Sequence, residues 1–167
     1  MLTAAYVLAG GLSSRFGSDK AIFKVEGVPM ARLVAGALAV GGGPVSLVSR
    51  HQRGLGLPEL IEPDGPRHPL WGVAHALRQS RGLVLFAPCD LPTLTPEMVS
   101  RLLATGRPAH ARYQPLVCLI DSCHAELAAQ AAERGTSVRA FMAATGSMGI
   151  DLGDLSNFNQ PPGAGGA

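Results

Sequence analysis

Short apolar runs alternate with helical patterns along almost the whole chain. Continuous apolar runs that end in glycine, proline or polar residues predict strands at residues 4–9, 45–48, 59–61, 83–87, 115–120 and 148–152. Apolar residues at helical spacing predict helices at residues 29–40, 72–79, 96–103, 125–134 and 138–144. Strands that alternate with helices predict an α/β, Rossmann-like, three-layer αβα fold, in which a mostly parallel sheet carries helices on both faces.

Composition agrees with one domain of this class. The chain has 167 residues, of which 47% are hydrophobic, which suffices for one core and leaves little room for two. Its 21 glycines and 13 prolines lie mostly between the apolar segments and indicate many turns. We therefore expect a single domain over residues 1–160 and a flexible tail over the proline- and glycine-rich residues 161–167.

Charge and cysteine content exclude several classes of partner. A net charge of +2 from dispersed residues gives no nucleic-acid surface. The first apolar run lacks a basic leader and breaks at glycines, so we expect neither a signal peptide nor a membrane segment. Three cysteines without Cys-x-x-Cys spacing predict no disulfide framework and no zinc site, and they suit a cytoplasmic protein.

The loop after the first strand carries the strongest chemical signal. Adjacent glycines let backbone N–H groups approach a phosphate, and nearby cations would neutralise its charge. The loop is neither a Walker loop nor Gly-x-Gly-x-x-Gly, which argues against kinases and dehydrogenases. The alternative is a tight turn beside a solvated charged surface. The residues expected to bind a nucleotide here are Leu8, Ala9, Gly10, Gly11, Leu12, Ser13, Arg15 and Lys20.

A second polar motif, Pro-Cys-Asp-Leu-Pro, follows the strand at residues 83–87. Its aspartate, Asp90, would lie at the carboxyl end of that strand, where ligands bind in parallel sheets. A carboxylate there can hold Mg²⁺, which prefers few carboxylates together with waters and phosphate oxygens. The alternative is an aspartate that stabilises a turn. Cys89, beside it, is assigned no chemistry, because the sequence offers no histidine–carboxylate pair to activate a thiol.

The string Leu-Ala-Gly-Gly-Leu-Ser-Ser-Arg-Phe-Gly-Ser-Asp-Lys-Ala, over residues 8–21, resembles the signature of the MobA-like nucleotidylyltransferases. That family includes molybdenum cofactor guanylyltransferases and cytidylyltransferases. The resemblance implies that Arg15, Lys20 and Asp90 are catalytic and that Asp90, in the family's Cys-Asp-x-Pro segment, holds Mg²⁺. It also implies a nucleotide-binding acid at Asp64, for which a simple turn aspartate is the alternative.

Weaker matches extend the resemblance toward the acceptor side of the site. His-Pro-Leu-Trp-Gly at residues 68–72 partly resembles the family's Gly-Pro-Leu-Ala-Gly. Gln114, before Pro115, resembles a segment near the pterin-binding side, and Asn157 with Asn159 resembles the family's Asn-x-Asn-Thr-Pro. These three polar residues are the expected acceptor-binding residues.

The resemblance implies transfer of GMP from GTP to the phosphate of molybdenum-molybdopterin, with release of pyrophosphate. The expected partners are GTP, the molybdopterin cofactor and, transiently, a molybdoenzyme or a cofactor chaperone. Three alternatives stay open: use of CTP, another phosphorylated acceptor, and a protein that binds nucleotide without turnover.

Overall fold

The computed structural model describes residues 2–9 and 19–157, without the side chains of Leu2 and Thr3. Its main sheet contains β1 (Leu2–Leu8), β4 (Val45–Ser49), β5 (Glu59–Ile61), β6 (Leu83–Pro88), β7 (Ala109–Ala111), β8 (Gln114–Asp121) and β9 (Met148–Ile150). A separate hairpin contains β2 (Lys24–Val25) and β3 (Val28–Pro29). The helices are α1 (Met30–Leu38), α2 (Pro69–Arg78), α3 (Pro96–Leu103), α4 (Ala125–Glu133) and α5 (Val138–Ala144), with short 3-10 turns η1 (Ala39–Gly41) and η2 (Ser122–His124).

The seven strands of the main sheet follow the order β5-β4-β1-β6-β8-β7-β9. β1 pairs in parallel with both β4 and β6, and β5 and β9 are also parallel to their neighbours. Only β8 runs antiparallel within this described sheet, against β6 on one side and β7 on the other. The predicted α/β fold with a mostly parallel sheet is therefore confirmed.

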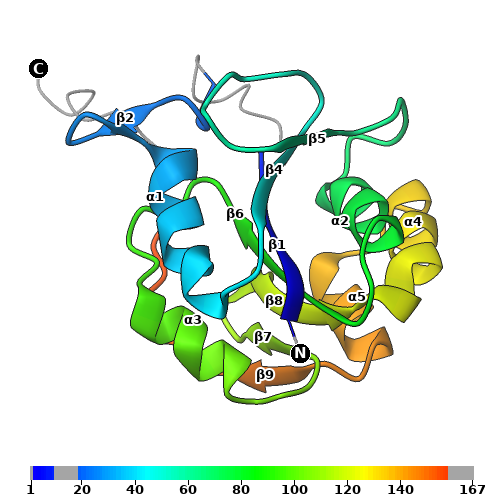
Figure 1. Cartoon of the computed structure of the whole chain (residues 1–167). Helices are drawn as coiled ribbons and strands as arrows, with labels where there is room; N and C mark the ends of the chain where they lie inside the picture. The colour runs from blue at the N-terminus through cyan, green and yellow to red at the C-terminus, as the bar shows by residue number, and fades with distance from the viewer. Residues whose placement is uncertain (1, 10–18, 158–167) are drawn as a thin grey trace, which may run out of the picture.

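Alternate side chains of β1 enter two different cores, one on each face of the sheet. Ala5 and Val7 pack with residues of α1 and α3, whereas Tyr6 and Leu8 pack with residues of α2, α4 and α5. Figure 1 shows these two helical layers on opposite sides of the sheet. A strand covered on both faces must be apolar at every position, which explains the continuous apolar runs.

Local signals fix where the helices begin. α3 begins after Thr95, whose hydroxyl accepts a hydrogen bond of 3.3 Å from the Met98 amide. α2 begins at Pro69, three residues before the predicted start at residue 72, because the His68 ring accepts a hydrogen bond from the Leu70 amide. Proline has no N–H to leave unsatisfied in a first turn, so it suits the start of α2.

Two features are absent from the sequence prediction. The strand β7 has only three residues, and each strand of the β2–β3 hairpin has two. The hairpin turns at Glu26 and Gly27, whose φ angles are 51° and 82°. Two consecutive positive φ angles allow a tight turn between antiparallel strands, and glycine adopts such an angle without strain.

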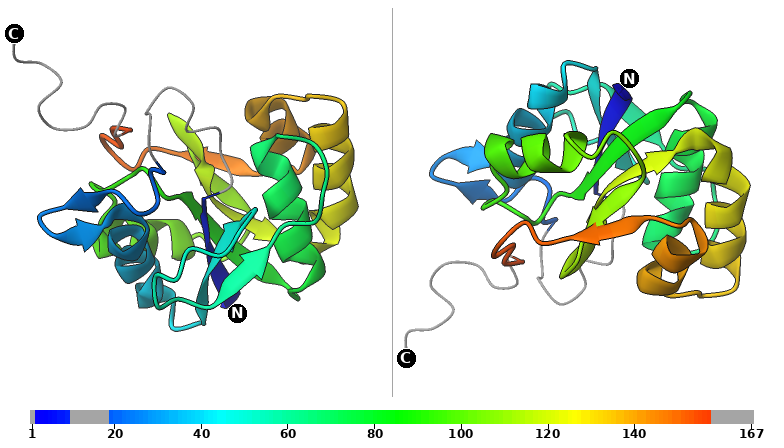
Figure 2. Two further views of the ribbon diagram at one scale, coloured as in Figure 1. Left: turned by 90° about the horizontal axis from the view of Figure 1, so that it is seen from above. Right: turned by 90° about the horizontal axis from the view of Figure 1, so that it is seen from below.

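The connections bring the carboxyl ends of β1 and β6 side by side. The chain leaves β1 through α1 on one face and reaches β4, and it later crosses through α2 on the other face and reaches β6. β1 and β6 are parallel neighbours, and in open parallel sheets ligands bind at the carboxyl ends of the strands. Figure 2 shows this edge of the sheet from above.

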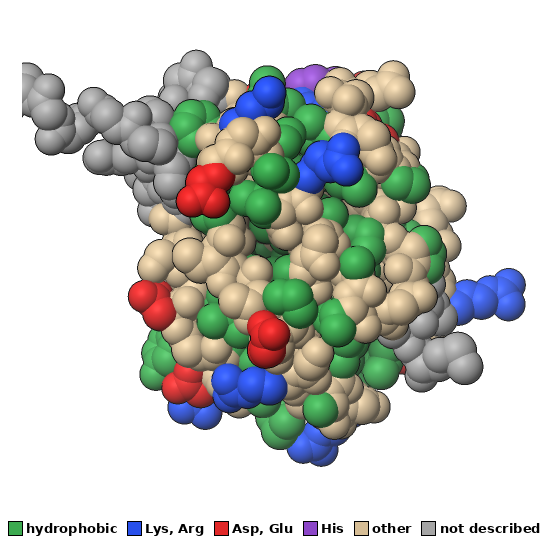
Figure 3. All heavy atoms as spheres, turned by 60° about the vertical axis from the view of Figure 1, so that its left-hand side comes forward, with side chains coloured by type: hydrophobic (Ala, Val, Ile, Leu, Met, Phe, Trp, Pro, Cys, Tyr) green, Lys and Arg blue, Asp and Glu red, His purple; other side chains and the backbone are tan. Residues whose placement is uncertain are grey.

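No helix within residues 2–9 and 19–157 is long and apolar enough to cross a bilayer. On the face drawn in Figure 3, acidic and basic side chains are interspersed and do not gather into one patch.

Candidate functional site

Asp90 lies at the carboxyl end of β6, between two buried residues. The Cys89 amide donates a 3.0 Å hydrogen bond to the Leu8 carbonyl, which continues the pairing of β1 with β6 past its last strand residues. Leu91 on the other side is fully buried, and its carbonyl accepts a hydrogen bond from the Leu94 amide. Both neighbours fix the backbone, so Asp90 is held at the carboxyl end of β6, next to the end of β1.

Lys20 reaches the same place from a segment distant in the sequence. Its Nζ lies 3.1 Å from Asp90 Oδ2, and the two side chains are 21% and 18% exposed. The following residue, Ala21, is fully buried and its carbonyl accepts a hydrogen bond from Ala31 at the start of α1. The structure thus brings together Lys20 and Asp90, two residues that the sequence predicted to share a site.

Cys89 lies beside this pair but is unsuited to nucleophilic attack. Burial, followed by the negative charges of Asp90 and Asp19, raises the pKa of its thiol to about 12. Only the thiolate is a good nucleophile, and at neutral pH this thiol is protonated. The three cysteines are free thiols, two of them buried.

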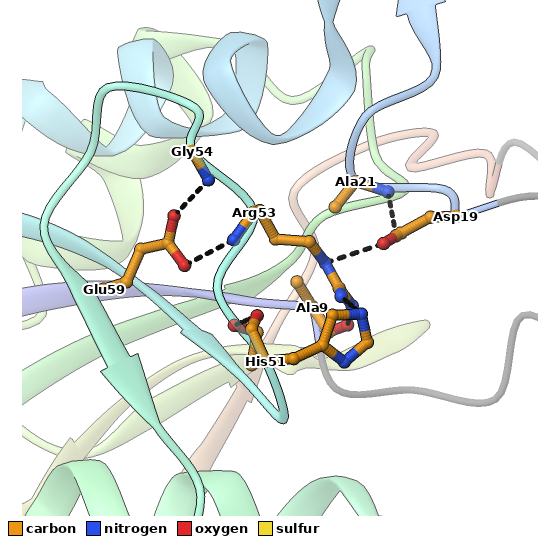
Figure 4. A network of polar contacts seen from close by, with 8 residues as sticks. Ala9, Asp19, Ala21, His51, Arg53, Gly54 and Glu59 are labelled. Atoms are coloured by element: carbon orange, nitrogen blue, oxygen red, sulfur yellow. Dashed lines mark hydrogen bonds and ion pairs between the residues drawn. The ribbon is translucent and has the colours of Figure 1, made fainter.

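An arginine with a buried side chain, Arg53 in the loop between β4 and β5, contacts the residue before Lys20 and the end of β1. Arg53 Nε lies 2.7 Å from Asp19 Oδ2, and its Nη2 donates a 3.3 Å hydrogen bond to the Ala9 carbonyl at the end of β1 (Figure 4). The Glu59 carboxylate accepts hydrogen bonds of 2.8 Å from the Arg53 and Gly54 amides. This loop is therefore fixed at the same sheet edge as Lys20.

The loop between β5 and α2 buries Glu62, and Asp64 is exposed on it. Arg50 Nε lies 3.8 Å from Glu62 Oε2, and the Glu62 side chain is 6% exposed. Burial raises the pKa of Glu62, and the positive charge of Arg50 opposes that rise. Among the described residues, no hydrogen bond or ion pair joins Asp64 to Lys20 or Asp90. The nucleotide-binding role of Asp64 stays a prediction.

Two of the expected acceptor-binding residues are in contact. Gln114 Nε2 donates a 2.6 Å hydrogen bond to Asn157 Oδ1, although the two lie 43 positions apart in the sequence. The antiparallel pairing of β8 with β6 ends at Phe86 and Cys118, so Gln114, at the start of β8, lies toward the end of the sheet where β6 ends. The pair therefore lies at the same sheet edge as the Lys20–Asp90 pair.

Several predicted residues lie outside the described part of the chain. Leu8 and Ala9 are described and are buried at the end of β1. The others are the predicted phosphate-loop residues Gly10, Gly11, Leu12, Ser13 and Arg15 and the acceptor candidate Asn159. The predicted tail at residues 161–167 is likewise not described.

Sequence reasoning did not single out Arg53 and left Asp19 as one residue of a motif. A signal for Arg53 was present, because residues 50–53 follow the strand at residues 45–48 and carry two arginines and a histidine. The carboxyl-end rule, applied to this strand as it was to the first and to β6, points to this segment. Which of its side chains reaches the site depends on the loop conformation.

Asp90 is a described carboxylate at the carboxyl end of β6, and Lys20 is its ion-pair partner. No group of three or more His, Cys, Asp or Glu residues in the described ranges is arranged to hold a metal ion. A site built from one or two carboxylates together with phosphate oxygens and waters does not need such a group. The donor set at Asp90 therefore fits Mg²⁺ bound with a nucleotide and does not fit a metal held by protein ligands alone.

A family model decides the relationship of this chain to known proteins. The model described as MobA-like NTP transferase domain matches residues 5–148, which include Lys20 and Asp90. The chain belongs to this family. The matched range also contains Arg53 and Gln114, so the contacts described above lie within the family domain.

Curated relatives of this MobA-like protein are similar over part of their length. A protein of Trichormus variabilis named probable molybdenum cofactor guanylyltransferase is 39% identical over 107 residues, covering 60% of this chain and 51% of the relative. A molybdenum cofactor guanylyltransferase of Rhodobacter capsulatus is 36% identical over 122 residues, covering 67% and 63% of the two chains. The match thus spans about half to two thirds of these relatives.

Solved structures share the fold at lower identity. Molybdopterin-guanine dinucleotide biosynthesis protein A of Archaeoglobus fulgidus superposes with a TM-score of 0.71 at 17% identity, covering 90% of this chain and 84% of that one. 2-C-methyl-D-erythritol 4-phosphate cytidylyltransferase of Thermus thermophilus gives 0.67 at 17% identity, covering 95% and 93%. At this identity the likeness establishes the nucleotidyltransferase fold alone.

Proposed function

We propose that this MobA-like protein transfers GMP from GTP to the phosphate of molybdenum-molybdopterin and releases pyrophosphate, with Mg²⁺ as its cofactor. The observation that carries the proposal is the Lys20–Asp90 pair of 3.1 Å at the carboxyl ends of the neighbouring strands β1 and β6. A cation and a carboxylate at this edge suit a triphosphate and its metal ion. The names of the curated relatives support the choice of GTP and of the molybdopterin acceptor.

Asp90 is the residue proposed to hold Mg²⁺, since it is the carboxylate at the carboxyl end of β6 that pairs with Lys20, and it is only partly exposed. When bound, Mg²⁺ would neutralise phosphate charge. Lys20, which lies 3.1 Å from Asp90, would place its ammonium against the phosphate oxygens of a bound nucleotide.

The remaining residues of the proposed site would bind the triphosphate and orient the reacting phosphates. The family motif assigns the backbone after Leu8, and Arg15, to the triphosphate. An attacking phosphate is already anionic, so the reaction needs no strong general base, and positioning with charge neutralisation carries the catalysis. The high pKa of Cys89 supports direct transfer without a covalent intermediate on that thiol.

The Gln114–Asn157 pair is the proposed acceptor side of the site. An amide side chain both donates and accepts hydrogen bonds, as recognition of a pterin ring requires. Because the pair lies at the end of the sheet where β6 ends, an acceptor held there would present its phosphate toward the nucleotide.

The test is pyrophosphate release from each nucleoside triphosphate with Mg²⁺ and molybdopterin, with and without molybdate. We expect release with GTP, and we expect Asp90→Asn to lose at least about a hundredfold in turnover, as expected when a main source of transition-state charge stabilisation is removed. Asp121→Asn is the matched control. Asp121 lies at the opposite end of the β6–β8 pair, where it caps η2, and asparagine caps equally well.

Each outcome points to a different conclusion. Release with CTP alone would replace the guanylyl assignment by a cytidylyl one. Folded protein that binds GTP and Mg²⁺, seen as a raised Tm, but turns over no triphosphate would indicate another acceptor or a binding protein. Near wild-type turnover by folded Asp90→Asn would remove Asp90 from the mechanism.

A further inference from the structure

The position of Lys20 depends on contacts made by the residue before it. Both oxygens of the Asp19 carboxylate are engaged (Figure 4): Oδ1 accepts a 3.1 Å hydrogen bond from the Ala21 amide, and Oδ2 forms an ion pair of 2.7 Å with Arg53 Nε, without the geometry of a hydrogen bond. One carboxylate thus ties together the backbone on both sides of Lys20. Any movement of Asp19 would move the base from which the Lys20 side chain reaches Asp90.

Arg53 is itself held from several elements. Its backbone amide is bound by the Glu59 carboxylate, its Nη2 donates to the Ala9 carbonyl, and its Nη1 contacts His51 Nε2. Because a guanidinium can only donate, the His51 nitrogen is the acceptor in that contact. The Arg53 side chain is 8% exposed, so this guanidinium is fixed inside the protein and is not a surface charge.

We propose that Arg53 is a positioning residue for Lys20. Acting through Asp19, its guanidinium holds residues 19–21 against the end of β1 and thereby sets the Lys20 ammonium at Asp90. The geometric part of this inference stands on the described contacts, and its catalytic consequence rests on the proposed function. Arg53 needs no contact with the reacting phosphates in this role.

Burial decides that the Arg53–Asp19 pair is more than a surface ion pair. Exposed ion pairs contribute little to the stability of a protein, because water and salt screen their charges. A guanidinium with 8% exposure that loses its carboxylate is left as an uncompensated buried charge. Arg53 and its Asp19 partner are therefore constrained to stay together, and the constraint passes along one peptide bond to Lys20.

The chain offers a direct readout of Lys20 that needs no enzymatic activity. Its only two lysines are Lys20 and Lys24. In protein labelled with ¹³Cε-lysine, Lys20 gives one side-chain signal, and Lys24, exposed on β2, gives the internal reference. We expect Arg53→Gln to move the Lys20 signal toward that of Lys24 and to leave Lys24 unchanged. Lys24→Arg assigns the two signals.

Arg32→Gln is the matched control. Arg32 Nη1 donates a 3.4 Å hydrogen bond to the Leu55 carbonyl of the same β4–β5 loop, but the Arg32 side chain is exposed. Its replacement removes a guanidinium from that loop without breaking the contacts of Asp19. Neither lysine signal should move in this variant.

The kinetic consequence separates positioning from nucleotide binding. A displacement of about 1 Å in a catalytic group can lower the rate about a hundredfold, so we expect Arg53→Gln to lower kcat about 10- to 100-fold and to change the KM for GTP less than about threefold. Arg53→Lys should recover part of kcat, because it restores the charge but not the fork that spans Asp19 and Ala9. In a Lys20→Ala background, Arg53→Gln should add little further loss.

Asp19→Asn removes the charge of the more exposed partner of the Arg53–Asp19 ion pair. This variant replaces Arg53→Gln in the experiment if Arg53→Gln does not fold. An unchanged Lys20 signal in the folded variants overturns the positioning role, whatever the activity. A full additional loss of kcat in the Lys20→Ala background overturns it as well. A shifted Lys20 signal in protein that turns over no triphosphate supports the positioning role and removes the proposed function.

Discussion

The thiol of Cys89 lies next to the carboxylate that the proposed function uses, so its reactivity tests the chemistry of the site. Burial, together with the charges of Asp90 and Asp19, raises its pKa from 9.0 to about 12. At pH 8 a thiol with the ordinary value is about 9% thiolate, whereas a pKa of about 12 leaves about 0.01%. We therefore expect Cys89 to react about a thousandfold more slowly in the folded protein than in the unfolded protein.

The assay is alkylation by iodoacetamide at pH 8, with each cysteine followed by mass spectrometry in native buffer and in denaturant. Cys123 is exposed and should be labelled in both conditions, which checks the reagent. Cys89→Ala should keep pyrophosphate release within about threefold of wild type, because the proposed transfer uses no thiolate. Labelling of native Cys89 within about tenfold of its unfolded rate would refute the reasoning, as would loss of turnover in folded Cys89→Ala.

The same shift predicts a pH dependence of stability. The folded-state pKa of Cys89 lies above the unfolded value, so the folded state binds the thiol proton more tightly. This contribution is fully present below about pH 9 and is lost as the pH rises toward about 12. Urea unfolding at pH 8 and pH 10.5 should therefore show a larger loss of stability in wild type than in Cys89→Ala. An equal loss in both proteins would contradict the assignment to Cys89.

Two further predictions concern packing around the site. Phe86 is fully buried and stacks on Tyr6 with ring centroids 5.7 Å apart, so Phe86→Ala should lower the free energy of unfolding by about 3–5 kcal/mol in urea titrations, and Phe86→Leu by less. A Cβ at Gly65 would lie 2.4 Å from the Trp71 ring, so Gly65→Ala should lower the Tm and shift the fluorescence of the only tryptophan. Gly36→Ala, where a Cβ meets nothing within 4 Å, should instead raise the Tm.

Periodicity predicted the layers of the fold but not every strand. The continuous apolar run that becomes β6 is apolar because both of its faces are covered, and that requirement is visible in the sequence. β7 is the sequence Ala-His-Ala, which has no β-branched residue and is too short to show a period. Its place is fixed by pairing with β8 and β9, and such pairing is a property of the assembled sheet.

The sequence predicted those parts of the candidate site that lie directly after a strand of the sheet. Lys20 and Asp90 were predicted to share a site because each follows a strand of a parallel sheet and belongs to a motif. Arg53 follows another strand, but its direction depends on Glu59, which binds the loop backbone, and on Gly54, whose φ is 67°. A side-chain contact with a residue six positions away determines the conformation of the loop, and no local sequence pattern indicates that contact.

The antiparallel strand β8 explains how the proposed acceptor and nucleotide residues come to lie at one end of the sheet. A parallel strand would begin at the edge where β6 begins, and Gln114 would then lie beside Leu83. Because β8 runs the other way, Leu83 pairs with Asp121, and the first residue of β8 lies at the edge where β6 ends. Asn157 reaches the same edge by following β9, and it closes the pair with Gln114. In the proposed reaction, the one reversed strand of the described sheet therefore sets the acceptor side next to the nucleotide side.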